Sequence, residues 1–360
     1  MNYSNADKTA ACSEETKELP TDRSGAQDAG AFSELPAFKT IPYPFRRDLC
    51  KKKFQQCMRV FDFRETEPEQ VCEREAKRTT LLDILEFLSQ NKQEFAHDLA
   101  VVAFDCFHAN LFRDVSRRAS KSRQLRNQHQ QQFIELLELE EEPQLEDAWP
   151  HLQVVYELLL RFICTLREDP EQIVRDFVTP AFVQKLFLLF ESDDPRERDY
   201  LKTIMHRIYG RFMGLRAFIR QQIMSLLFHV LHEEEQLHAG LAEILEILAS
   251  VVSGFATPLK EEYKTLLERS LIPLHKVSDL SAFHQQLSQT VVFYVEKDPY
   301  LSAKVVTGLL RFWPQTNSAK EILFLNELEE VLEKTPPQCF GGILEKLFSR
   351  LSICISSVHF

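Results

Sequence analysis

The segment DDPRERDYLKTIMHRIYGRFMGLRAFIR, from Asp193 to Arg220, carries the pattern that decides the fold. Apolar side chains recur in it every three or four positions, which is the spacing of one helix face. They are Leu201, Met205, Ile208, Phe212, Leu215 and Ile219. We therefore predict one long helix that packs this apolar stripe against neighbouring helices.

A second stripe lies one position further round the expected helix and mixes aromatic, sulfur and guanidinium groups. Its members are His206, Tyr209, Met213, Arg216 and Arg220. Arginine matches carboxylates and phosphates, while tyrosine and methionine offer apolar contact. The stripe indicates a surface for a segment that carries both apolar anchors and negative charge. The alternative is the ordinary solvated face of an amphipathic helix.

Helical patterning continues over most of the chain from about residue 41, and no alternating strand pattern interrupts it. Asp194-Pro195 and Asp298-Pro299 each place a capping side chain before a first-turn proline. Prolines mark the expected breaks, at Pro150, Pro170, Pro180, Pro195, Pro258, Pro273, Pro299, Pro314, Pro336 and Pro337. The expected helices cover residues 81–88, 95–112, 148–166, 182–190, 241–255, 283–295, 305–313, 322–332 and 343–355. Helix pairs about 40 residues apart predict an all-α solenoid of HEAT- or armadillo-like repeats, and the alternative is an irregular helical bundle.

Two segments lack this pattern. Residues 1–40 are polar and without apolar periodicity, so we expect a disordered N-terminal tail ahead of a repeat domain at 41–360. Residues 113–144 pass from a basic stretch into an acidic run, which predicts a long polar loop. Within this loop Arg117 and Arg118 precede Ser120 at a spacing that basic-directed kinases recognise. Ser120 is therefore a candidate phosphorylation site, and an unmodified loop is the alternative.

Composition excludes several classes of function. The 360-residue chain has nine glycines and none between Gly30 and Gly210, which disfavours glycine-rich phosphate loops. A formal net charge of −11 disfavours a general nucleic-acid binder, because phosphate contacts require a basic surface. No apolar run reaches membrane-spanning length, and the N-terminus lacks the pattern of a secretion signal. We expect a protein of the cytoplasm and/or nucleus.

Chemistry-bearing residues form no recognisable active site. The eight cysteines contain no C-x-x-C pair, so we expect reduced, buried thiols. His229 and His232 share a helix face with His238 nearby, but nothing completes a metal-ligand set. A peptide- and protein-binding scaffold and a hydrolase with a site hidden from sequence both remain hypotheses. Low glycine content and helical patterning favour the scaffold, which needs no cofactor and is not an enzyme.

Several long stretches resemble one known family. They are LEDAWPHLQVVYELLLRF (145–162), FESDDPRERDYLKTIMHRIYGRFMGLRAFIR (190–220), LAEILEILASVVSGFATPLKEEYK (241–264), LIPLHKV (271–277) and SAKEILFLNELEEVLE (318–333). Over about residues 54–360 the chain is similar to the B-prime regulatory subunits of protein phosphatase 2A. The resemblance implies a curved solenoid of HEAT-like repeats. It also implies a regulator that joins the phosphatase scaffold and catalytic subunits and recruits substrates carrying Leu-x-x-Ile-x-Glu peptides.

The resemblance further implies a peptide groove between neighbouring repeats. One wall would be Thr203, His206, Arg207, Tyr209, Met213, Arg216 and Arg220, and the other Glu246, Ile247, Val251, Lys260 and Tyr263. Ile247 and Val251 would enclose the isoleucine of the peptide together with Tyr209, and the basic side chains would meet its glutamate. The chain departs from the usual family pattern at Val251, Met213 and Tyr263. Tyr263 replaces a histidine, which removes a group able to carry positive charge.

Two larger differences from the family concern the loop and the end of the chain. The loop at 113–144 begins with basic residues where family members are usually proline-rich and acidic. The chain ends at ICISSVHF (353–360), where the family continues through further helices. We therefore expect a truncated solenoid whose last helix lacks a neighbour. The alternative function is a helical-repeat adaptor that binds peptides without assembling the phosphatase.

Overall fold

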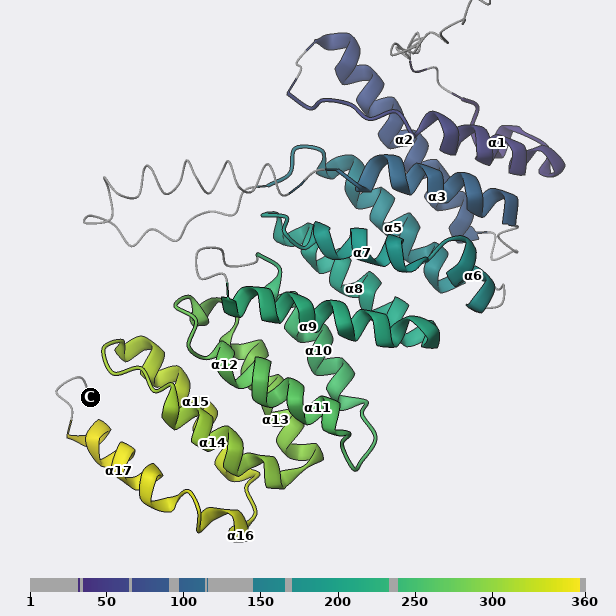
Figure 1. Ribbon diagram of the computed structural model, residues 1–360. Helices are drawn as coiled ribbons and strands as arrows, with labels where there is room; N and C mark the ends of the chain where they lie inside the picture. The colour runs from purple at the N-terminus through teal and green to yellow at the C-terminus, as the bar shows by residue number, and fades with distance from the viewer. Residues whose placement is uncertain are drawn as a thin grey trace, which may run out of the picture.

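The computed structural model describes residues 32, 35–64, 67–90, 97–113, 115, 145–165, 170–232 and 239–356, and every regular element in these ranges is a helix. The prediction of an all-α fold is confirmed. Figure 1 shows the helices stacked in pairs along a curved path, from α1 near one end to α17 at the other. The molecule is therefore a helical solenoid rather than an irregular bundle.

The pairs form two rows, in which each helix contacts the next helix of its own row. The first row is α1 (Tyr43–Gln56), α3 (His97–Leu111), α7 (Pro180–Leu189), α9 (Arg216–His232), α12 (Ile272–Leu274), α14 (Ser302–Arg311) and α17 (Leu344–Ile355). The second row is α2 (Pro68–Gln90), α5 (Trp149–Thr165), α8 (Pro195–Arg211), α10 (Leu241–Ser253), α13 (His284–Lys297) and α15 (Ser318–Glu333). Shorter connecting helices are α6 (Pro170–Asp176), α11 (Glu261–Leu266) and α16 (Pro337–Phe340).

The apolar faces of both rows meet in one continuous core that extends from Phe38 to Cys354. Each of the nine helices expected from sequence overlaps a helix of the structure. Both predicted caps are also present, because Asp194 accepts a hydrogen bond from the backbone N–H of Arg196 and Asp298 accepts one from that of Tyr300. Local sequence signals therefore mark where these two segments begin.

The prediction of one long helix over 193–220 is wrong. Helix α8 ends at Arg211, Phe212 adopts an extended backbone, and a single 3₁₀ turn, η2 (Met213–Leu215), leads into α9. Gly210 and Gly214 flank this break, and glycine is a poor residue for a helix interior. The six residues of the apolar stripe are nevertheless all buried. The 3₁₀ turn therefore leaves the stripe residues of both α8 and α9 facing the core.

The predicted break at Pro273 is also wrong. Helix α11 passes without interruption into a π-helical turn, η3 (Leu267–Leu271), and then into α12, which contains this proline. Proline lacks a backbone N–H, so it interrupts the regular α-helical hydrogen bonds. A π-helical turn directly before it is one way for a helix to absorb such an interruption.

A buried charged cluster joins consecutive repeats. Glu327 on α15 accepts hydrogen bonds from Nε2 of His275, at 2.9 and 3.1 Å, and from Nε2 of His284, at 2.9 Å. Nδ1 of His275 lies 2.9 Å from the carbonyl oxygen of Ile272. Both ring nitrogens of His275 thus face groups that only accept hydrogen bonds, so this ring is a protonated imidazolium. The cluster ties the end of α12 and the start of α13 to α15.

The packed region begins before residue 41. Phe38 is buried and its ring stacks on that of Phe87, with centroids 4.1 Å apart, so the expected tail boundary at residue 40 lies inside the packed part. Ser120 and nearly all of the predicted loop at 113–144 lie outside the described residues. No described helix has both the length and the apolar character that a membrane crossing requires.

Seven cysteines fall within the described ranges, and all are free thiols. Four are buried, Cys339 is intermediate, and Cys72 and Cys164 are exposed, so the expectation of uniformly buried thiols is wrong at these three positions. Cys12 lies outside the described residues.

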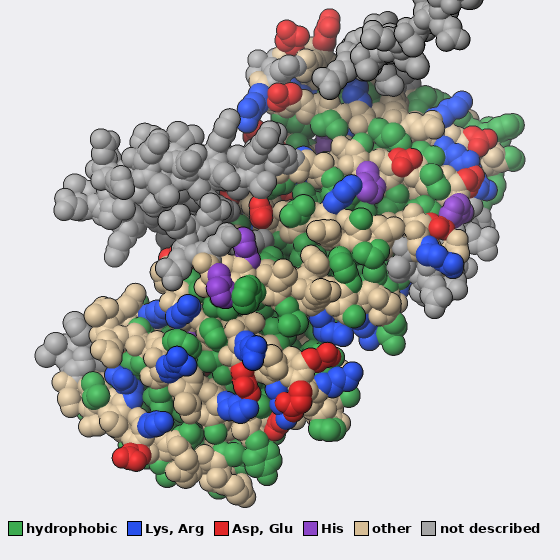
Figure 2. Space-filling model, in the orientation of Figure 1, with side chains coloured by type: hydrophobic (Ala, Val, Ile, Leu, Met, Phe, Trp, Pro, Cys, Tyr) green, Lys and Arg blue, Asp and Glu red, His purple; other side chains and the backbone are tan. Residues whose placement is uncertain are grey.

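Figure 2 shows hydrophobic side chains exposed among polar ones on the face formed by the first row. Leu188 on α7 and Phe228 on α9, two helices of this row, are 60% and 58% accessible. Helix α17 also exposes apolar side chains, with Phe348 62% and Ile355 83% accessible. Exposed large hydrophobic side chains are therefore spread along the described helices, and α17 carries more of them than any other helix.

Candidate functional site

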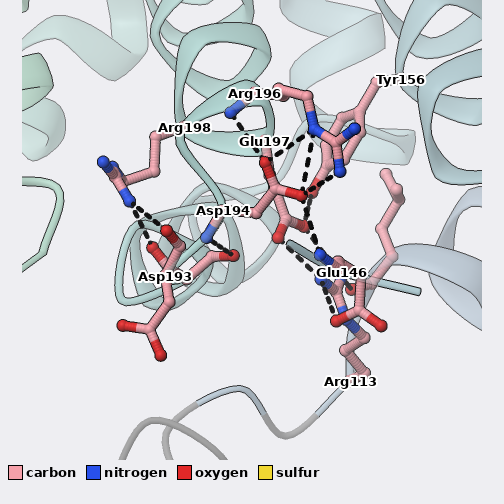
Figure 3. Close-up of polar contacts among 10 residues, drawn as sticks. Arg113, Glu146, Tyr156, Asp193, Asp194, Arg196, Glu197 and Arg198 are labelled. Atoms are coloured by element: carbon pink, nitrogen blue, oxygen red, sulfur yellow. Dashed lines mark hydrogen bonds and ion pairs between the residues drawn. The ribbon is translucent and has the colours of Figure 1, made fainter. Parts of the chain in front are cut away.

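A polar network fixes the start of α8, the helix that carries most of the candidate groove (Figure 3). Glu197 is fully buried and accepts two hydrogen bonds from Arg113, at 2.8 and 2.7 Å, and one from the Tyr156 hydroxyl, at 2.6 Å. Arg113 also pairs with Glu146. Burial, then the charge of Glu197, raises the pKa of Tyr156 well above its usual value, so the hydroxyl stays protonated and keeps donating. The network therefore ties α8 to α5 and to the end of α3.

Three polar contacts then join α8 to α10 along their length. Nε of Arg198 donates to Glu243 at 2.8 Å, and Nζ of Lys202 lies 2.7 Å from Glu246. One turn later the Nε2 of His206 lies 2.8 Å from the Ser250 hydroxyl. The α8 residues are four positions apart and their partners on α10 are three or four apart, which is helical spacing on both sides. We call these three contacts the polar ladder.

The turn between α8 and α9 is held by an arginine of the candidate site. Nε of Arg216 donates to the carbonyl oxygen of Tyr209 at 2.9 Å, and its Nη2 donates to that of Gly210 at 3.1 Å. Its guanidinium lies over the ring of Tyr209, 5.2 Å from the centroid. A cation in this place satisfies carbonyl groups that the end of α8 leaves without helical partners. Arg216 is therefore part of the helix cap as well as of the surface.

A second arginine connects the two expected walls. Nη1 of Arg220 donates to the Tyr209 hydroxyl at 3.2 Å, and its guanidinium lies 5.7 Å from the ring centroid of Tyr263. Tyr263 in turn stacks on Phe255, with centroids 3.8 Å apart and planes 8° from parallel. Burial raises the pKa of Tyr263 above its usual value, although Arg220 opposes this shift, so the phenol is neutral at physiological pH. Arg220 is thus positioned by two aromatic residues, Tyr209 and Tyr263, and keeps its positive charge. We call this arrangement the aromatic setting of Arg220.

The remaining expected site residues differ in how much surface they offer. Arg207, Met213 and Lys260 are exposed, with Met213 70% accessible, while Thr203 and Glu246 are partly exposed. Ile247 and Val251 retain only 1% and 5% of their accessible surface and belong to the core. The apolar surface that a ligand would meet here is therefore formed by Tyr209, Met213 and Tyr263. Tyr209 and Tyr263 pack against the core to which Ile247 and Val251 belong.

Sequence reasoning missed five residues of this site. Arg198, Lys202, Glu243 and Ser250 belong to the polar ladder, and Phe255 stacks on Tyr263. The first two have a usable signal, because Arg198 and Lys202 precede His206 by eight and four positions and so share its helix face. Phe255 follows the end of α10, where helical spacing no longer applies.

The described residues contain no group of three or more His, Cys, Asp or Glu side chains that could hold a metal ion. His229 and His232 both lie on α9, and His232 stacks on Phe228 with ring centroids 4.0 Å apart. His238, the third histidine considered above, lies outside the described residues. The candidate site therefore offers charge, hydrogen bonds and apolar contact, which are properties of a binding surface.

Comparison with known proteins identifies relatives over nearly the whole chain. The family described as "Protein phosphatase 2A regulatory B subunit (B56 family)" matches residues 35–360. The 56 kDa regulatory subunit delta isoforms of serine/threonine-protein phosphatase 2A from Oryctolagus cuniculus and Homo sapiens are each 43% identical over 332 residues, which is 91% of this chain and 54% and 53% of theirs. The B-prime eta isoform of the 59 kDa regulatory subunit from Arabidopsis thaliana is 43% identical over 331 residues, 91% of this chain and 62% of its own.

These relatives are named as regulatory rather than catalytic subunits, in agreement with the prediction that the chain is not an enzyme. The chain spans about half to three fifths of their length. The match covers every helix of both rows, including those that carry the polar ladder and the aromatic setting of Arg220. The chain is a member of the B56 family of protein phosphatase 2A regulatory subunits.

Proposed function

We propose that this chain is a regulatory subunit that recruits substrates to protein phosphatase 2A in the cytoplasm or nucleus, where it contributes to signal transduction. It binds the scaffold and catalytic subunits and holds acidic Leu-x-x-Ile-x-Glu peptides of substrates along α8 and α10. The observation that carries this proposal is the position of Arg220, whose guanidinium is oriented by the Tyr209 hydroxyl and the Tyr263 ring. A preoriented arginine loses little conformational freedom when it binds a carboxylate.

The chemistry of the surface favours a peptide with mixed character. Arg207 and Lys260 add exposed positive charge to that of Arg220, and Met213 adds exposed apolar area. Glu246 is already paired with Lys202, so its negative charge is compensated within the protein. An acidic residue and an apolar residue on one extended peptide would therefore both find complementary groups.

Charge reversal at Arg207 tests the peptide site. Arg207 is exposed on α8 next to His206 in sequence, whereas Arg216 caps α8 and its replacement would also disturb the turn. Arg207→Glu should weaken binding of a fluorescent Leu-x-x-Ile-x-Glu peptide by about thirtyfold, or about 2 kcal/mol. Arg269→Glu is the matched control, since Arg269 is exposed on η3. Fluorescence anisotropy should show equal affinity for the parent and the control. If Arg207→Glu binds the peptide as tightly as the parent does, the peptide does not bind at this site.

Capture of the phosphatase is a separate measurement. The tagged chain should retain purified scaffold and catalytic subunits on a resin, and a competing acidic peptide should leave that retention unchanged. Peptide binding without retention of either of these subunits would favour the peptide-binding adaptor over the phosphatase regulator.

A further inference from the structure

A cavity of about 300 Å³ lies far along the chain from the candidate groove, in the first repeats. Its walls come from the connection between α1 and α2, the end of α3 and the start of α5. Phe61, Phe63 and Leu152 line it with apolar surface, and Lys77, Asn110 and His151 line it with polar groups. This volume is at the lower end of the range for small-ligand pockets and suits a group of side-chain size.

Lys77 is the unusual member of this lining. Its side chain is fully buried, and Nζ donates to the carbonyl oxygen of Arg59 and to Oδ1 of Asn110, both at 2.6 Å. Nζ also lies 5.8 Å from the ring centroid of Phe61. An ammonium has three N–H groups, so one donor remains after these two hydrogen bonds. No carboxylate among the described residues pairs with it, whereas buried charges are normally paired.

The groups around Lys77 do not supply the missing negative charge. Burial raises the pKa of the neighbouring Cys57 thiol to about 12, so it stays neutral. His151 is also neutral, because burial, and then the charge of Lys77, lowers its pKa to about 4. At the edge of the cavity Arg113 and Glu146 pair with each other (Figure 3). Burial lowers the pKa of Lys77 to about 8, so it still carries its proton at pH 7.

Aromatic rings flank this buried cation. The ring of His151 meets those of Phe63 and Phe61 edge to face, with centroids 4.9 and 6.1 Å apart. The cavity thus combines one buried positive charge with an apolar, aromatic wall, and the charged residues Asp62, Arg64, Arg113, Glu146 and Asp147 also line it. We propose that it binds a carboxylate of side-chain size, whose oxygen accepts a hydrogen bond from Nζ of Lys77 and whose apolar body packs on Phe61 and Phe63. The carboxylate comes either from a small organic acid or from the C-terminal residue of a peptide.

Matched pairs of probes test the charge requirement. Phenylacetate is compared with phenylacetamide, and acetyl-Ala-Ala-Phe with a free C-terminus is compared with its C-terminal amide, by calorimetric titration of the full chain. At least one acid should bind tenfold or more tightly than its amide. Preference for phenylacetate identifies a small acid as the source, and preference for the peptide identifies a C-terminus. Equal binding of acid and amide in both pairs, or no binding of either acid, overturns the proposal.

Two substitutions locate the binding. Ala109 is exposed and lines the cavity, so Ala109→Trp should occupy part of it while every charged residue is retained, and should weaken binding at least tenfold. Ala217→Trp, at an exposed alanine on α9, is the matched control and should bind as the parent does. Lys77→Met should abolish the preference for acid over amide if it folds. If Lys77→Met does not fold, Ala109→Trp alone tests the location of binding. Unchanged affinity for the acids in Ala109→Trp would show that they do not bind in this cavity.

Discussion

Glu327→Gln should destabilise the protein by about 3 kcal/mol or more. The carboxylate is 1% exposed and accepts hydrogen bonds from His275 and His284 at 2.9 Å, and His275 is an imidazolium. Glutamine keeps the shape but removes the negative charge, so one buried cation loses its counter-charge. Breaking a buried ion pair by removal of one partner costs about 3–5 kcal/mol. The loss arises from the charge left behind rather than from a cavity.

Urea unfolding followed by circular dichroism at pH 5.5 measures this loss. Glu329→Gln is the matched control on the same helix, because Glu329 is exposed, and it should change stability by less than about 0.5 kcal/mol. If Glu327→Gln is no more destabilising than Glu329→Gln, the cluster carries no net ion-pair energy and the reasoning fails.

The same variant should remove a pH dependence of stability. Burial works to lower the pKa of His275, but the charge and hydrogen bond of Glu327 raise it above its ordinary 6.5. The stabilisation that protonated His275 contributes is therefore complete below about pH 6.5, and it is lost as pH rises through the higher pKa of His275 in the folded protein. Burial works to raise the pKa of Glu327, but His275 and His284 lower it from 4.5 to about 2. The stabilisation that ionised Glu327 contributes is lost as pH falls from 4.5 towards 2. The free energies of unfolding of the parent and Glu327→Gln should therefore differ most between about pH 4.5 and 6.5.

Three further changes have defined outcomes. Tyr263→His should strengthen binding of an acidic peptide below pH 7, where the imidazole gains charge, and anisotropy titration at pH 6 and 8 measures this. Tyr43→His, at an exposed position on α1, is the control and should have no effect. Gly308→Ala should cost about 1–3 kcal/mol in urea unfolding because its Cβ would overlap the Cγ2 methyl of Ile272, whereas Gly341→Ala meets open space and should cost less than about 1 kcal/mol. Asp194→Ala should cost about 1–2 kcal/mol through the lost cap of α8, and equal urea midpoints for Asp194→Ala and Asp193→Ala would contradict that role.

The repeat architecture could be predicted because its signals are local. Apolar spacing of three and four residues and the Asp-Pro pairs at Asp194 and Asp298 act within a single helix. The break at Phe212 was missed because the apolar spacing passes through the turn unchanged. Its only local signals are Gly210 and Gly214, which lower helix propensity without fixing where the helix ends.

The candidate site was predictable in composition but not in geometry. Periodicity on α8 found His206 and Tyr209, and the family resemblance supplied Tyr263, which is 43 positions beyond Arg220 in sequence. The position of Arg220 over the Tyr263 ring and the burial of Ile247 depend on how α9, α10 and α11 pack. Such contacts are properties of tertiary packing, which one sequence pattern does not specify.

The polar ladder has a mechanical consequence for recognition. Its three contacts all join α8 to α10, so a shift of α8 along α10 by part of a turn would lengthen all three together. The two helices therefore resist small sliding movements along each other. The side chains that α8 presents, Arg207 and Tyr209 among them, therefore keep a fixed position along α10. A ligand that spans both helices would need contact groups at a matching spacing.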